Sequence, residues 1–472
     1  TYAYDEFGNV LSQSISYFDN LNPKVLHSSA TYETTSGSRI FGALKSETNS
    51  AGKTTHYYYD ENKGYLTTVI EPDNRGMGYA YNSLGNLIGA LPMYHNTTTD
   101  EIYGNVDYEL ILYAYNQKNQ LTTISTKSTE YSLSYDIFGN TDTISIGNRT
   151  LAEYEYQEKN GKLTSMTYGN GCTVYYLYDK LENLSELWYS YDGGNTITAA
   201  YHYTYSTNGQ LCRFDNLLTD KSVVYTYDSF GRLISFAEYD TDTMKNTLGM
   251  TQSYNEQSQL SMLSYRVPYA YTGGISDAIV SQNYYYDSEG RVSSSAIKTG
   301  NAYNTILSVQ YSYDPAQRIV SQTNTHYNGA SSFTSGYEYG YRSVSYVTTN
   351  QISSYKSTFN NHESNYTFQY DDVGNITQIS LDGSVKYRYQ YDHIRQLIRE
   401  DNKEAGKTYI YEYDNAGNII KKKIYDYTEA SYPSGTPIVY EYTYGDLTWG
   451  DLLTAYRGMA ITYDNIGNPL NL

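Results

Sequence analysis

The sequence predicts an all-β protein: an array of antiparallel β-hairpins joined side by side in one large sheet, with almost no helix. Three observations lead to this prediction. A nine-residue hairpin motif recurs from end to end, its leading tyrosines follow one another at a nearly constant spacing in the most regular part of the chain, and no window shows a convincing apolar period of 3.6 residues. Alternation of apolar and polar residues is typical of strands, whereas the longer period indicates helix.

The motif is clearest at Tyr411–Ile419. Tyr411 and Tyr413 alternate with a polar residue, as in a strand with one buried face. Asp414 suits the first position of a β-turn, because its carboxylate can accept a backbone N–H two residues on. Gly417 can adopt the positive φ that closes a three-residue hairpin loop with a bulge. Ile419 then begins the returning strand.

Six further copies repeat this pattern of Tyr-Asp, two variable residues and Gly. With the first, the seven strict copies place predicted hairpin-turn residues at Tyr4, Asp5, Gly8, Tyr135, Asp136, Gly139, Tyr227, Asp228, Gly231, Tyr286, Asp287, Gly290, Tyr370, Asp371, Gly374, Tyr413, Asp414, Gly417, Tyr463, Asp464 and Gly467. Looser copies begin at Tyr59, Tyr81, Tyr115, Tyr156, Tyr178, Tyr205, Tyr254, Tyr313, Tyr391 and, faintly, Tyr346. The copy at Tyr391 has Arg395 in place of the glycine, so we expect a different or strained turn there.

The spacing of the motif tyrosines indicates a repeat architecture. The steps from Tyr115 to Tyr135, Tyr156 and Tyr178 are 20, 21 and 22 residues. Such a period is typical of units that bury their apolar faces against their neighbours. We therefore interpret residues 1–472 as a single continuous array, truncated at both ends because the chain opens and stops inside a repeat.

Some segments depart from the regular repeat. Residues 24–50 lack a clear hairpin turn and are expected to hold an eroded repeat. Inserted loops are expected at residues 90–107, 241–251, 265–278, 329–341 and 429–437, which are rich in turn-forming residues.

Composition excludes several classes of protein. With 63 tyrosines and 10 phenylalanines, the apolar face is built mainly from Tyr, which suits a sheet that is only partly dry. The net charge of −19 argues against binding to nucleic acid, which requires clustered Lys and Arg. The basic run at residues 421–423 is interpreted as a solvated strand that discourages edge pairing. The sequence contains neither a membrane-spanning apolar stretch nor a signal peptide.

No catalytic, metal or cofactor site is expected. The seven histidines stand singly, and no nucleophile elbow, phosphate loop or metal-ligand spacing is present. The turn aspartates lie one per hairpin, whereas calcium requires six to eight converging oxygens, so turn capping is the favoured interpretation. Cys172 and Cys212 lie in neighbouring repeats, which leaves a disulfide between them open, although two free thiols are favoured.

The tyrosine-rich strands also fit a binding surface for glycans. Aromatic rings beside hydroxyl and amide groups suit sugars, and Trp188 and Trp449 are the first candidates for stacking. The favoured alternative is that the rings pack across strands, where each pair adds about 0.5–1.5 kcal/mol beyond burial. A lone hairpin is marginal in water, so these contacts are needed to hold the array together.

The recurring Tyr-Asp-x-x-Gly unit with a following Asn or Arg resembles the repeat of the Rhs/YD-repeat family. That family includes bacterial Rhs and wall-associated polymorphic toxins, the C component of insecticidal toxin complexes, and animal teneurins. The seven strict copies carry the resemblance, and the looser copies extend it over essentially the whole chain. The step Gly169-Asn170-Gly171 before Tyr178 is similar to another recurrent family feature.

The resemblance implies a large antiparallel sheet that spirals into a hollow β-shell, of which this chain would form part or all. In toxin members the shell encloses a C-terminal effector, and it usually ends in a segment that cuts itself with aspartates near an Asp-Pro-x-Gly motif. Asp314-Pro315-Ala316-Gln317 lacks that glycine and lies in mid-array, so we interpret Asp314 as an ordinary turn aspartate. A self-cutting segment and an effector are expected beyond Leu472.

The leading hypothesis is therefore a non-enzymatic shell fragment, secreted or displayed on the surface of a bacterium, that sequesters a C-terminal toxin absent from this chain. The runner-up is an extracellular adhesion protein whose exposed tyrosines or loops bind glycans or a cell surface. An enzyme ranks third. A toxin-like domain after the array would favour the first hypothesis. Loss of glycan binding after exposed Tyr or Trp residues are changed to Ala would favour the second.

Overall fold

The computed structural model describes residues 1–19, 22–105, 108–243, 246–271, 274–300, 304–344, 346–360 and 362–471. The described backbone consists of strands and turns and contains no helix, so the predicted all-β fold is confirmed. It follows that this part of the chain has no helix capable of crossing a membrane.

The strands follow one another as antiparallel hairpins. The first nineteen are β1 Tyr2–Tyr4, β2 Val10–Asp19, β3 Asn22–Tyr32, β4 Leu44–Thr48, β5 Thr54–Tyr59, β6 Leu66–Ile70, β7 Arg75–Tyr81, β8 Leu87–Asn96, β9 Glu101–Gly104, β10 Ile111–Tyr115, β11 Leu121–Ser125, β12 Glu130–Tyr135, β13 Thr141–Ile146, β14 Arg149–Tyr156, β15 Leu163–Tyr168, β16 Thr173–Tyr178, β17 Leu184–Ser190, β18 Thr198–Tyr205 and β19 Leu211–Asn216. The others are β20 Lys221–Tyr227, β21 Leu233–Asp240, β22 Asn246–Tyr254, β23 Leu260–Tyr271, β24 Gly274–Tyr286, β25 Val292–Thr299, β26 Asn304–Tyr313, β27 Ile319–Asn328, β28 Ser331–Val344, β29 Val347–Phe359, β30 His362–Tyr370, β31 Ile376–Leu381, β32 Ser384–Tyr391, β33 Leu397–Asn402, β34 Lys407–Tyr413, β35 Ile419–Asp426, β36 Ile438–Thr443, β37 Ala455–Tyr456 and β38 Met459–Ala460.

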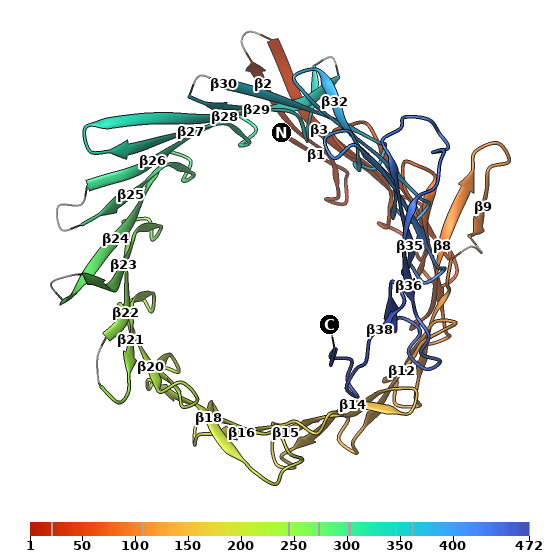
Figure 1. Ribbon diagram of the computed structural model, residues 1–472. Coiled ribbons are helices and arrows are strands. Elements are labelled where there is room, and N and C mark those ends of the chain that lie inside the picture. The colour runs from red at the N-terminus through yellow and green to blue at the C-terminus, as the bar shows by residue number, and fades with distance from the viewer. Residues whose placement is uncertain are drawn as a thin grey trace.

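One short parallel pairing closes the sheet on itself. The start of β29 lies beside β3, with Val347 opposite Val25 and Thr348 opposite Leu26. The Val25 N–H donates to the Tyr346 carbonyl at 2.8 Å. Because β9 is a side branch of β8, the strands β3–β8 and β10–β29 form a closed shell of 26 strands. Figure 1 shows this wall as a ring.

The sheet continues past its closing point. Strands β30–β36 extend the ladder from β29 and overlap β1–β9 in Figure 1, which shows that the wall begins a second turn. Side-chain contacts join the two turns; Lys53 after β4, for example, forms an ion pair with Asp372 after β30 at 2.5 Å. The chain therefore spirals through more than one circuit. In the view of Figure 1, its C-terminal end lies inside the outline of the ring.

The wall has little dry core. Few of the described apolar side chains are fully buried, among them Ile70, Ile146 and Ala200. Most of the motif tyrosines are half-buried instead. Other strand tyrosines pack ring against ring; Tyr355, for example, packs against Tyr337 and Tyr366 with ring centroids 5.7 and 5.8 Å apart. Cross-strand aromatic contacts of this kind stabilise a sheet whose faces are not both covered.

The expectation of inserted loops is wrong at four of the five segments. Residues in 90–107, 241–251, 265–278 and 329–341 instead form the hairpins β8–β9, β21–β22 and β23–β24 and much of β28. Each of these strands has a neighbour that satisfies its backbone hydrogen bonds, so the surrounding sheet overrides the low strand propensity of Gly and Ser. Positions 106, 107, 244, 245, 272 and 273 lie outside the described residues. Residues 429–437 do form a loop, between β35 and β36.

The eroded repeat in residues 24–50 is present. Tyr32 ends β3, and the backbone bond from the Glu33 N–H to the Ala43 carbonyl closes an enlarged turn at 2.9 Å. The Tyr32 hydroxyl donates to the Val10 carbonyl at 3.2 Å, a bond that recurs at the regular repeats.

Candidate functional site

Each strict copy of the motif forms the same turn, as the bonds of Asp414 show. Its N–H donates to the Asn418 carbonyl at 2.9 Å, and the Gly417 N–H donates to its carbonyl at 3.1 Å. One carboxylate oxygen accepts the N–H groups of Ala416 and Asn418 at 3.0 and 2.8 Å, and the other accepts the Asn418 amide at 3.1 Å. Gly417 has a φ of 94°, which residues with a side chain rarely adopt. Aspartate closes the loop and glycine reverses the chain.

The other predicted turn residues occupy equivalent positions. In each turn the aspartate accepts the backbone N–H of the residue four positions later, at Asp5, Asp136, Asp228, Asp287, Asp371 and Asp464. The glycines all have positive φ: Gly8 88°, Gly139 96°, Gly231 80°, Gly290 81°, Gly374 98° and Gly467 89°. Arg395 and Gln317 adopt φ values of 70° and 66° at the same point of the looser copies. The expectation of strain at Arg395 is therefore confirmed. Asp314 makes the ordinary turn bonds, accepting the Arg318 N–H at 2.9 Å.

The motif tyrosines join each repeat to the one before. The Tyr413 hydroxyl donates at 2.8 Å to the carbonyl of Leu397, the first residue after the preceding turn. The same bond is made by Tyr135 to Leu121, Tyr227 to Leu211, Tyr286 to Leu260, Tyr370 to Ile352 and Tyr463 to Leu453, at 2.6–2.9 Å. Leu397 lies beside the bulge between Gln390 and Tyr391. The hydroxyl thus supplies a partner where the ladder is interrupted.

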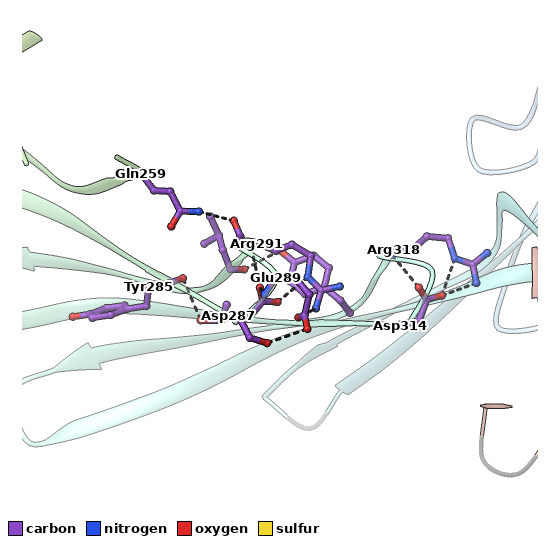
Figure 2. Close-up of polar contacts among 12 residues, drawn as sticks. Gln259, Tyr285, Asp287, Glu289, Arg291, Asp314 and Arg318 are labelled. Atoms are coloured by element: carbon purple, nitrogen blue, oxygen red, sulfur yellow. Dashed lines mark hydrogen bonds and ion pairs between the residues drawn. The ribbon is translucent and has the colours of Figure 1, made fainter. Parts of the chain in front are cut away.

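The residue four positions after the turn aspartate also reaches the next repeat. Where it is Arg, its Nε donates to the aspartate: Arg291 contacts Asp287, and Arg318 contacts Asp314, each at 2.7 Å (Figure 2). The Arg291 guanidinium then lies over the ring of the next motif tyrosine, Tyr313, 4.5 Å from its centroid. Such a cation–π contact adds about 0.5–1 kcal/mol at an exposed site.

Where Gln stands four positions after the first turn residue, which is Asn, Ser or Asp in these copies, it bonds to the next turn instead. The Gln259 amide donates to the Gly290 carbonyl at 2.9 Å (Figure 2). The same bond runs from Gln120 to Gly139, Gln210 to Gly231 and Gln396 to Gly417, each at 3.1 Å. The sequence analysis missed these bonds, although their signal is present: each of these Gln turns immediately precedes a strict Gly turn.

The environment keeps the two motif side chains in opposite protonation states at neutral pH. The Asn183 amide, together with backbone N–H groups, holds the pKa of Asp179 below its usual value. Burial raises the pKa of Tyr413, and it raises the pKa of Tyr411 to about 12. The Asp179 carboxylate is therefore a charged acceptor, and the Tyr413 hydroxyl remains a neutral donor.

The point of closure is held by one turn of this kind. Arg318 pairs with Asp314, and both side chains are only 10% exposed. The Arg318 guanidinium also donates to the Thr348 hydroxyl at 3.1 Å and to the Tyr17 hydroxyl at 2.6 Å. It thus contacts β29 and β2 on the two sides of the closing pair. We call Arg318, Asp314, Thr348 and Tyr17 the closure cluster.

Beyond the closure cluster, hairpin turns in the second circuit of the sheet contact hairpin ends in the first circuit. We call these contacts the seam. They comprise the ion pairs Lys53–Asp372, Glu71–Arg395 and Arg149–Asp446, the 3.0 Å bond from Asn170 to Asp464, and the backbone bonds from Glu109 to Asn415 and from Gly450 to Ser128. The seam therefore joins residues roughly 300 positions apart almost wholly through turn residues, a pairing that local sequence patterns do not encode.

The two predicted stacking residues lie in different surroundings. The Trp188 indole N–H donates to Glu186 at 2.6 Å, and its half-buried ring lies on β17. Trp449 lies at the seam, where its backbone forms an isolated antiparallel β-bridge with Thr129 and its ring lies against Gly467. A separate open cleft of about 670 Å³ is lined by Tyr337, Tyr355, Tyr366 and other aromatic residues. Glycan stacking at Trp188 and Trp449 stays a prediction.

No metal site is found among the described residues, where no three His, Cys, Asp or Glu side chains converge. Cys172 and Cys212 are both free thiols. Histidines that have an acidic partner make local contacts; the His95 Nε2, for example, lies 2.9 Å from the Asp100 Oδ1.

A closed β-shell built from Tyr-Asp hairpin turns defines a YD-repeat shell protein. No family model matches the chain. Its sequence is 26% identical to teneurin-1 of Gallus gallus over 186 residues, which are 37% of this chain and 6% of the relative. It is also 26% identical to the tRNA3(Ser)-specific nuclease WapA of Bacillus spizizenii over 203 residues, 43% of this chain and 8% of that protein. Both relatives are Rhs/YD-repeat proteins, so the resemblance found in the sequence is confirmed.

The fold has a counterpart among solved structures. The crystal structure of TcdB2-TccC3-TEV matches 99% of this chain with a TM-score of 0.72 and 13% sequence identity, and the match covers 26% of that larger chain. This likeness shows the shell fold alone. The chain thus spans less than a tenth of the length of these two relatives and about a quarter of that structural neighbour.

Proposed function

We propose that this chain is the structural wall of a container, part of a longer bacterial protein that is secreted or displayed at the cell surface. The wall sequesters a C-terminal effector segment of the parent protein, and it is not itself an enzyme. The observation that carries the proposal is the closure of the sheet, because a wall sealed between β3 and β29 can separate its contents from solvent proteases. An open sheet would leave them accessible.

Two further observations support a container. The matched sequences and structure are repeat and shell regions, which fits a structural role for this chain. The relative WapA is named as a nuclease, yet the match covers only 8% of it. Under this proposal, an activity of that kind resides in the effector that the wall encloses.

The test uses the natural chain extended to its own C-terminus. The protein is treated with a nonspecific protease under native conditions, and the surviving fragments are identified by mass spectrometry. The proposal predicts a C-terminal fragment that survives until the shell is denatured. A variant with Arg318→Ala should open the closure cluster, and its C-terminal fragment should then be digested under native conditions. Immediate digestion of the C-terminal segment in the unmodified chain would contradict the proposal.

A further inference from the structure

Two hairpins of the wall carry the same polar pattern. Residues 211–228 and 397–414 align without a gap at an offset of 186, since 397 − 211 = 186, and both contain Leu-x-Arg-x-Asp-Asn followed by a Lys that begins the next strand. Asp215 lies opposite Ser222, and Asp401 lies opposite Thr408. The equivalent backbone bonds recur, for example from Leu217 to Ala200 and from Lys403 to Lys386, both at 2.8 Å. The two hairpins are structural copies.

In the second copy, the polar pattern binds a peptide segment of the chain itself. Arg399 is 4% exposed, and its Nε donates to Asp401 at 2.8 Å. Its two terminal nitrogens donate to the carbonyls of Ser431 and Thr428 at 2.9 and 3.0 Å. The Thr408 hydroxyl accepts the Thr428 N–H at 3.1 Å. The loop after β35 is thus fixed on the sheet by its main chain.

A charged side chain of that loop is bound by the neighbouring strand. The Glu429 carboxylate forms an ion pair with Arg388 on β32 at 2.6 Å. Arg388 lies opposite Asp401 in the ladder and so belongs to the same face of the sheet. The bound segment therefore presents two carbonyls three residues apart, with a carboxylate between them. The two carbonyls and Asp401 accept from the three guanidinium nitrogens of Arg399, whereas the carboxylate binds Arg388.

In the first copy the same groups are present, and Arg213 and His202 are exposed, whereas Ser222, whose hydroxyl accepts from Arg213, is only 2% exposed. Arg213 is 47% exposed; its Nε donates to Asp215 at 2.7 Å, and one terminal nitrogen donates to the Ser222 hydroxyl at 3.0 Å. His202 takes the place of Arg388, lies opposite Asp215 and is 44% exposed. Among the described residues, which exclude 244 and 245, no loop carbonyl bonds to Arg213.

We propose that Arg213 and His202 form a docking site for an extended acidic peptide segment of a partner protein. The segment binds in the manner of Thr428–Ser431 on the second copy: its carbonyls accept from Arg213, and its carboxylate faces His202. The guanidinium is already oriented by Asp215, so little side-chain freedom is lost on binding. This site is independent of whether the wall encloses an effector.

The probe is a fluorescein-labelled peptide with the sequence of residues 426–433, Asp-Tyr-Thr-Glu-Ala-Ser-Tyr-Pro, titrated to about 1 mM against the whole chain. Fluorescence anisotropy should show saturable binding. Arg213→Lys should weaken it by at least about tenfold, because lysine keeps the charge but cannot make the paired bonds. Arg291→Lys, at an exposed turn far along the sheet, should leave it unchanged.

Two further measurements keep the test decisive. Hydrogen exchange should show new protection at residues 213–222 when the peptide is added, and circular dichroism should show that Arg213→Lys is folded. A peptide with Gln in place of Glu429 should bind more weakly to the unmodified chain. Absence of saturable binding, binding that Arg213→Lys leaves unchanged, or protection confined to other strands would each overturn the proposal.

Discussion

The wall and the seam of this shell are held by different forces. Within the wall, the β34–β35 hairpin pairs seven residues of β34 with β35, and Tyr413 adds a bond to the preceding repeat. At the seam, two circuits of the same sheet meet through single ion pairs such as Lys53–Asp372, whose side chains are 29% and 55% exposed. Exposed pairs of this kind contribute about 0.2–1 kcal/mol each. The wall should therefore withstand conditions that separate the circuits.

Alkaline pH should have the largest effect, and it should act on the wall. Burial raises the pKa of many wall tyrosines, and that of Tyr411 to about 12. A group whose pKa is raised on folding gives stability that is complete below its unfolded value, near 10, and is lost as the pH rises through the folded value. We expect steep cooperative unfolding between about pH 10 and 12, followed by circular dichroism and by tyrosinate absorbance near 295 nm. Full tyrosine ionisation with an intact sheet would contradict this.

Loss of Arg318 should open the shell at its closing point. Arg318→Ala leaves the Asp314 carboxylate, only 10% exposed, without its partner and removes the bonds to Thr348 and Tyr17. Breaking a buried pair costs about 3–5 kcal/mol. Hydrogen exchange at the start of β29 should rise sharply. The matched control is Arg291→Ala, whose Asp287 partner lies away from the closure cluster and whose loss should cost about 1 kcal/mol or less.

Salt and acid should loosen the seam before the wall. At about 1 M salt the Debye length falls to about 3 Å, which weakens the Lys53–Asp372 and Arg149–Asp446 pairs. Although burial opposes it, hydrogen bonds from Asn468 and Asn170 hold the pKa of Asp464 below 3.8. A carboxyl with a lowered pKa gives stability that is present above its unfolded value and is lost as the pH falls through the folded value. Proteolysis should then cut seam turns while the β34–β35 ladder stays protected from hydrogen exchange. If the seam turns became cleavable and the β34–β35 ladder lost its protection under the same conditions, the distinction between seam and wall would be refuted.

The smallest effect concerns a single link within the wall. Tyr413→Phe removes the hydroxyl that bonds to the Leu397 carbonyl at 2.8 Å and should destabilise that repeat by about 0.5–1.5 kcal/mol. Hydrogen exchange of the backbone amides from Leu397 to Tyr413 should accelerate by the factor that corresponds to this loss of stability. Tyr432→Phe provides the control, because Tyr432 is 90% exposed and its loss should change nothing.

Local features of this fold follow from sequence, whereas its long-range contacts do not. The Asp and Gly of the motif predict the turn at Asp414, because both act within five residues. The hydroxyl partner of Tyr413 requires the register between neighbouring repeats, and the contacts of Arg318 with Tyr17 and Thr348 require closure of the whole ring. Residues 329–341 read as a loop because Gly and Ser are poor strand formers, yet β27 and β29 provide the ladder for β28, which begins at Ser331. The hairpins that carry Arg213 and Arg399 share one polar pattern, but its role in binding a peptide segment is visible only where the loop after β35 lies on Arg399.

Closure of the ring is the central claim, and a disulfide across the closing pair tests it most directly. Val25 and Val347 lie opposite each other in the parallel pairing. In a chain with Cys172→Ser and Cys212→Ser, the double variant Val25→Cys and Val347→Cys should crosslink almost completely under mild oxidation, because neighbouring strands lie about 4.8 Å apart. The control pair Val25→Cys and Val223→Cys, with Val223 on β20, should not crosslink. A folded sheet in which the first pair also stays reduced would show that the wall is open.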